Sequence, residues 1–144
     1  MTDIDAAKLP VMPSSLRLPT IGRLWQGFAD RADREGWGAA RFLAAVCEHE
    51  LAERTDRRIA RHMAESGLPA GKTLATFDFA AVPTVRKPHL EALARGDGWI
   101  EQGGNLLIFG PSGTGKTHLA AAFGTALVDN GKRVLFTRTT DLVQ

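Results

Sequence analysis

An eight-residue glycine-rich segment constrains the fold of this chain more than any other feature of its sequence. Residues 110–117 read GPSGTGKT and match the pattern G-x-x-x-x-G-K-S/T at every fixed position. The residues before it, NLLIFG, form an apolar run without alternation, which predicts a buried strand of a parallel sheet over 105–109. Apolar residues at helical spacing follow from Leu119 to Leu127. A strand, a tight turn and a helix in this order predict the opening of a parallel α/β unit.

The residue types of this segment suit the binding of nucleotide phosphates. Its glycines permit a sharp turn, a positive φ and a close approach of the backbone to an anion, and successive N–H groups converge at the positive end of the following helix. Lys116 can reach the β- and γ-phosphates, and the Thr117 hydroxyl can bind Mg²⁺. The alternative, a glycine-rich turn before an ordinary helix, leaves the flanking strand and helix unexplained. The predicted binding residues are Gly110, Pro111, Ser112, Gly113, Thr114, Gly115, Lys116 and Thr117, with Thr117 as the magnesium ligand.

No catalytic residue is predicted. Hydrolysis requires a second acidic group, on a later strand, that organises Mg²⁺ and the attacking water. After Thr117 the acidic residues are Asp129, at the end of the following helix, and Asp141, where a helix-capping role beside Thr140 is favoured. Neither residue ends an apolar strand, so we expect nucleotide binding without hydrolysis.

The residues before the motif predict a helical domain and a linker. Residues 1–17 contain Pro10 and Pro13 and read as a flexible arm. Two amphipathic helices follow, one from Thr20 and one over about 39–66, which predict a small all-α domain over 18–67. The first carries Ile21, Leu24, Trp25 and Phe28 on one face, for which core packing is favoured over docking of a partner.

The second half of the chain is expected to hold the α/β core. Residues 68–87 are irregular and read as a linker, and 88–144 are expected to form the core. Within it, a short helix should begin near Pro88 with Leu90 and Leu93 facing inward, and RVLFT (133–137) predicts a second strand. TTDLVQ then reads as the first turn of another helix.

The charge pattern leaves DNA binding open. The formal net charge of +2 is too small to indicate nucleic-acid binding, so any such case depends on clustered charge. Four arginines fall at i, i+3, i+4 and i+7 on one helix face, where they can contact DNA phosphates or form a solvated face paired with Glu50, Glu53 and Asp56. These candidate DNA contacts are Arg54, Arg57, Arg58 and Arg61. The single cysteine and the absence of a long apolar run indicate a cytoplasmic protein with no membrane partner.

Six segments spread over most of the chain carry a family resemblance. They are LRLPTIGRLW (16–25), REGW (34–37), FLAAVCEHELAERTDRRIARHM (42–63), LPAGKTLATFDF (68–79), NLLIFGPSGTGKTHLA (105–120) and GKRVLFTRTTDLV (131–143). Through them the chain resembles the IstB-like ATP-binding proteins, ATPase helpers encoded beside the transposase of certain insertion sequences. It is similar, more distantly, to the DnaC-type helicase loaders. The leading helices and the TL-x-x-FDF pattern separate this family from other P-loop ATPases.

The resemblance implies an α/β P-loop NTPase core of the AAA+ type, incomplete in this chain, preceded by the helical domain. It implies ATP and Mg²⁺ as ligands, and DNA, the transposase of the same element and further copies of the full-length protein as partners. Only the Walker A (P-loop) residues transfer position by position. The Walker B acid, the sensors and the arginine finger of the family are absent, so we expect a natural truncation or a partial sequence that binds ATP weakly. A helicase loader, or a non-enzymatic helical module with a vestigial P-loop, stays open as an alternative.

Overall fold

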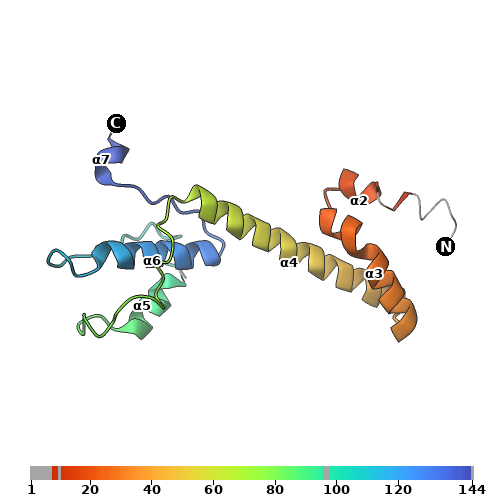
Figure 1. Cartoon of the computed structure of the whole chain (residues 1–144), viewed down its shortest axis with the longest axis horizontal. Helices are drawn as coiled ribbons and strands as arrows, with labels where there is room; N and C mark the ends of the chain where they lie inside the picture. The colour runs from red at the N-terminus through yellow and green to blue at the C-terminus, as the bar shows by residue number, and fades with distance from the viewer. Residues whose placement is uncertain (1–7, 10, 96–97, 144) are drawn as a thin grey trace. The chain divides into compact units, whose positions relative to one another are not determined.

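The computed structural model describes residues 8–9, 11–95 and 98–143 (Figure 1). The helices are α2 (Met12–Ser15), α3 (Pro19–Glu35), α4 (Ala39–Glu65), α5 (Lys87–Ala94), α6 (Lys116–Asp129) and α7 (Thr139–Leu142). The chain divides into two compact units, unit 1 (Met1–Arg57) and unit 2 (Arg58–Gln144). The domain boundaries expected from the sequence stay a prediction. No helix in the described part of the chain is both long and apolar enough to cross a membrane.

Unit 1 contains α2, α3 and α4 as far as Arg57. The sequence predicts a flexible arm over 1–17, but residues 12–15 form α2, and Pro13 is buried where α2 packs against α3. Residues 1–7 and 10 of that arm lie outside the described part. Helix α3 confirms the helix expected from Thr20 and ends at Gly36, whose φ of 65° lies in the left-handed region. Helix α4 confirms the helix expected over 39–66.

Glu50, rather than Thr20, caps the N-terminus of α3. Threonine is a common helix cap, but Thr20 is the second residue of α3, and the N-cap residue, Leu18, makes no side-chain hydrogen bond to the backbone. The Glu50 carboxylate, only 3% exposed, accepts hydrogen bonds from the N–H groups of Thr20 (2.8 Å) and Ile21 (3.0 Å). These are two of the N–H groups that a helix start leaves without intrahelical partners. A residue 30 positions away therefore supplies the cap.

The environment of Glu50 keeps its carboxylate ionised. Burial raises the pKa of Glu50, but the backbone N–H groups of Ile21 and Thr20, the Thr20 hydroxyl and the charge of Arg57 outweigh burial and lower the pKa below its ordinary value. Arg57 Nη2 lies 3.2 Å from the second carboxylate oxygen. The negative charge also suits the positive end of the α3 dipole.

The apolar face predicted for α3 turns into unit 1. Ile21 and Trp25 line an apolar cavity of about 470 Å³ together with residues of α2 and α4, including the buried Val46. Phe28 packs edge-on against the ring of His49, with 4.9 Å between ring centroids. This face therefore turns toward α2 and α4 with its four residues half-buried, and the choice between core packing and docking of a partner stays a prediction.

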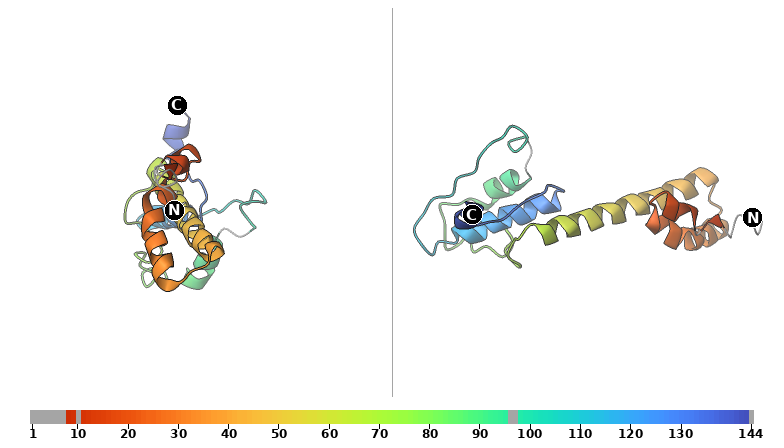
Figure 2. Two further views of the ribbon diagram at one scale, coloured as in Figure 1. Left: turned by 90° about the vertical axis from the view of Figure 1, so that its right-hand side faces the viewer. Right: turned by 90° about the horizontal axis from the view of Figure 1, so that it is seen from above.

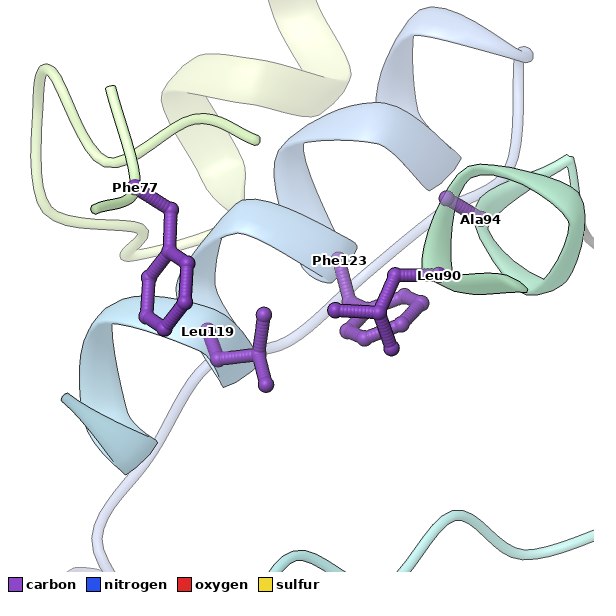
Figure 3. Close-up of a cluster of buried hydrophobic side chains, with 5 residues drawn as sticks. All are labelled: Phe77, Leu90, Ala94, Leu119 and Phe123. Carbon is purple, nitrogen blue, oxygen red and sulfur yellow. The ribbon is translucent and has the colours of Figure 1, made fainter. Parts of the chain in front are cut away.

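Unit 2 has a small core where α5, α6 and the segment before α5 meet. Figure 3 shows Leu119 and Phe123 of α6 pointing toward Leu90 of α5, with Phe77 against the start of α6. Leu90 is buried and Leu93 is packed against the same core, which confirms the inward face expected for the short helix. The segment 67–86 is irregular, as expected, yet it contributes Phe77 to the core.

The two strands expected over 105–109 and 133–137 are not formed. Within the described residues both segments lie outside regular secondary structure, and Figure 2 draws them as plain trace without arrows. Leu107 is 73% exposed, Phe109 86% and Leu135 72%, so these side chains have no second layer against them. A strand requires a neighbour that completes its hydrogen-bond ladder, and the two segments do not pair with each other. The α/β sheet predicted from the sequence is therefore absent from the described part, and the prediction of strands is wrong there.

Candidate functional site

The glycine-rich segment forms a tight turn that leads directly into α6. Gly113 and Gly115 have φ values of 80° and 79°, in the left-handed region that favours glycine, and Gly115 is the N-cap of α6. No side chain caps this helix, so the N–H groups at its start, from Lys116 onward, keep their capacity to donate. A Cβ added at Gly113 would meet no atom within 4 Å beyond the neighbouring residues of the chain. Free donors at a helix N-terminus beside an open turn are the arrangement that binds anions.

The irregular segment before α5 packs against the start of α6, next to this turn. A Cβ at Gly115 would lie 3.0 Å from Cε2 of Phe77, so the backbone at the helix start rests against that ring. His118 packs edge-on against the same ring at 5.4 Å, and its Nε2 lies 3.2 Å from the Thr76 hydroxyl. The sequence does not assign Phe77 to the site. The FDF pattern at 77–79 was the available signal.

Lys116 lies across the turn that it follows. Its Nζ donates to the carbonyl oxygen of Pro111 at 2.5 Å, and the Thr114 hydroxyl donates to the same oxygen at 2.9 Å. Lys116 and Thr117 also line a cavity of about 650 Å³ together with Pro69, Ile108, Ala120, Phe136, Thr137, Arg138 and Thr139. No acidic residue is among these described lining residues. The cavity is therefore cationic, and its volume is in the range of roughly 300–1,000 Å³ that small-molecule sites occupy.

The residues present fit a nucleotide bound with Mg²⁺. The N–H groups that begin α6 and the ammonium of Lys116 can hold phosphate oxygens, and the exposed hydroxyl of Thr117 can take one metal position. The described residues contain no group of three or more histidine, cysteine, aspartate or glutamate side chains that could hold a metal ion. A divalent ion at this site would therefore depend on phosphate oxygens and water for its remaining ligands.

The sequence as a whole has clear relatives. The profile of the family described as IstB-like ATP binding protein matches residues 12–144. This chain belongs to that family. The resemblance stated from the residues is thereby confirmed.

Three relatives from the family have names that refer to insertion sequences. A protein of Sinorhizobium fredii (strain NBRC 101917 / NGR234), whose name describes an insertion sequence ATP-binding protein, is 64% identical over 141 residues, which cover 98% of this chain and 47% of the relative. The corresponding protein of IS5376 from Geobacillus stearothermophilus is 34% identical over 89% of this chain and 51% of its own length. That of IS21 from Pseudomonas aeruginosa is 33% identical over 90% and 48%. The chain thus spans about half the length of these IstB-like relatives.

The two acidic residues after the loop, Asp129 and Asp141, do not line the cavity. Asp129 is the last residue of α6 and is exposed. Asp141 is in α7, is exposed, and accepts a hydrogen bond from the Thr140 hydroxyl at 3.1 Å. Neither is among the residues that line the cavity with Lys116.

All four candidate DNA-binding arginines are exposed residues of α4, but their contacts differ. In unit 1, Arg54 donates to the carbonyl oxygen of Arg17 at 2.8 Å, and Arg57 pairs with Glu50 at 3.2 Å. In unit 2, neither Arg58 nor Arg61 forms an ion pair with a described residue. The predicted face is therefore partly occupied by internal contacts and partly available.

Proposed function

We propose that this chain binds ATP with Mg²⁺ through residues 110–117 and serves an insertion sequence as an ATP-binding helper that assists a transposase on DNA. The observation that carries the proposal is the uncapped start of α6 beside Lys116, in a member of a family of ATP-binding proteins. The three relatives described above are all named for insertion sequences, which favours transposition over helicase loading.

Each part of the loop has a role in this proposal. The amides from Gly113 to Lys116 bind the phosphate oxygens, because they lie at the positive end of α6. Lys116 transfers its ammonium from the Pro111 carbonyl to the β- and γ-phosphates, where a full negative charge is the better acceptor. The Thr117 hydroxyl oxygen would be one ligand of Mg²⁺, which would neutralise part of the negative charge of the phosphates. Phe77 fixes the helix start against which the phosphates rest.

The proposal includes DNA, the transposase and further copies of the protein as partners. Arg58 and Arg61 are the residues best placed to bind DNA phosphates, since they form no ion pair with a described residue. Phosphate contacts of this kind carry no sequence information, so they suit a helper that acts on many DNA sequences.

The nucleotide part of the proposal is tested by the affinity of the chain for a fluorescent ATP analogue in the presence of Mg²⁺. Lys116→Ala should weaken binding by roughly 10- to 100-fold, since a charge-assisted hydrogen bond to phosphate contributes about 1.5–3 kcal/mol. Lys72→Ala is the matched control, because it removes the same charge from an exposed position outside the cavity. Equal affinities for wild type and Lys116→Ala would refute the proposed nucleotide site.

A further inference from the structure

A second cation lines the cavity that contains Lys116. Arg138 directly precedes α7 and lies 22 positions beyond Lys116 in the sequence, yet both residues line the same cavity of about 650 Å³. Thr117, Thr137 and Thr139 add three hydroxyl groups to its lining. The cavity therefore brings two cations and several neutral donors to one place.

The extended segment before Arg138 is held in place by two contacts with the end of α4. The N–H group of Phe136 donates to the carbonyl oxygen of the buried Ser66 at 2.7 Å. Nη2 of Arg133 lies 3.3 Å from Oε2 of Glu65. The backbones also approach closely at Gly67, where an added Cβ would lie 3.1 Å from the carbonyl oxygen of Phe136. Arg138 is thus two residues away from an anchored position.

The charge of Arg138 has no partner among the described residues. Its carbonyl oxygen accepts hydrogen bonds from the N–H groups of Asp141 and Leu142, but its guanidinium takes part in no ion pair with a described residue. The carboxylate of Asp141, three residues later in the sequence, instead accepts a hydrogen bond from the Thr140 hydroxyl. Arg133, on the same segment, differs because it has Glu65.

We propose that Arg138 is a second phosphate-binding residue of this cavity and contacts the nucleoside triphosphate that Lys116 holds. The inference rests on the proposed function, since it concerns the same ligand. A guanidinium presents paired N–H donors that match two phosphate oxygens, whereas an ammonium acts as a point charge. Arg138 therefore adds hydrogen bonds of defined direction to the positive charge that Lys116 supplies. Through Arg138, the segment 132–138 contacts the nucleotide bound at the loop.

The test measures the affinity of the chain for the fluorescent ATP analogue with Mg²⁺, and for a labelled DNA duplex, in four variants. Arg138→Ala should weaken ATP binding about tenfold, and Arg138→Lys should lie between Arg138→Ala and wild type. Arg86→Ala is the matched control, because it removes the same charge from an exposed residue that does not line the cavity. Lys116→Ala reports on the underlying nucleotide site.

Each outcome decides the inference. Weaker ATP binding in Arg138→Ala, with wild-type binding in Arg86→Ala and partial recovery in Arg138→Lys, supports it. Wild-type ATP affinity in Arg138→Ala, alongside a loss in Lys116→Ala, overturns the inference and leaves the nucleotide site standing. A loss confined to DNA binding also overturns it and assigns Arg138 to a DNA phosphate. Wild-type ATP affinity in Lys116→Ala overturns the nucleotide site itself and the inference with it.

Discussion

Replacement of Glu50 tests whether one buried carboxylate holds unit 1 together. Its side chain accepts the N–H groups of Thr20 and Ile21 and pairs with Arg57. Loss of an N-terminal cap costs about 1–2 kcal/mol, and loss of a negative charge at a helix N-terminus costs about 0.3–1 kcal/mol. The pair with Arg57 adds less than about 1 kcal/mol, because the arginine side chain is half exposed. Glu50→Ala should therefore lower the free energy of unfolding by about 2–3 kcal/mol.

Two further variants separate the cap from the charge. Glu50→Gln keeps an acceptor of similar shape and loses the charge, so we expect a loss of about 1 kcal/mol. Glu48→Ala removes an exposed carboxylate from the same helix and should change stability by less than about 0.5 kcal/mol.

The assay is chemical denaturation followed by tryptophan fluorescence. All variants carry Trp99→Phe, so that the signal comes from Trp25 and Trp37 in unit 1. Equal stabilities for Glu50→Ala and Glu48→Ala would refute the reasoning, since they would mean that α3 does not depend on this cap.

Four further measurements test the charge of Glu50, the glycine-rich turn, the arginines of α4 and the lining of the cavity. Because the pKa of Glu50 is lower in the folded than in the unfolded state, its contribution to stability should be complete above the unfolded-state pKa and lost as the pH falls through the folded-state pKa. Acid titration should therefore give a flatter stability profile for Glu50→Gln than for wild type, and identical profiles would contradict this. Gly115→Ala should reduce binding of the ATP analogue at least tenfold, because φ is 79° and the new Cβ would meet Phe77 at 3.0 Å. A second replacement, Phe77→Leu, should not restore binding. Recovery of binding would show that the positive φ is unimportant. Replacing both Arg58 and Arg61 by alanine should reduce the slope of log affinity for DNA against log salt concentration by about two. The reduction should be smaller when alanine replaces Arg54 and Arg57, whose charges are paired with Glu50. Equal slopes for the two double variants would contradict this. In a phosphate-release assay with ATP, the chain should not exceed the rate measured without protein, because no described residue that lines the cavity is acidic. Measurable turnover would show that a carboxylate does reach the site.

The helices could be predicted from the sequence because their signals are local. Apolar spacing, Pro88 and the glycines at 36 and 115 determine where α3, α4, α5 and α6 begin or end, to within a few residues. The glycine-rich motif likewise predicted the turn before α6. The arrangement of the loop residues as nucleotide ligands stays a prediction.

The contacts that the sequence did not reveal are those between distant residues. The apolar run before Gly110 predicted a strand, but strand formation depends on a neighbouring strand, which the described residues do not supply. Glu50 reads as one charge on a solvated helix face, because nothing local shows that the start of α3 meets it 30 residues earlier. Phe77 lies at the loop because of packing, and Arg138 lines the cavity because its segment is anchored elsewhere. Neither arrangement leaves a periodic pattern in the sequence.

The central claim is that the amides at the start of α6 bind nucleotide phosphate, and amide NMR of the labelled chain tests it most directly. On titration with ATP and Mg²⁺, the ¹H–¹⁵N signals of residues 113–117 should shift in proportion to saturation, and those of α3 should stay in place. Lys116→Ala should require roughly 10- to 100-fold more ATP for the same shifts of these signals. Saturable binding that moves other amides and leaves residues 113–117 unaffected would contradict the account.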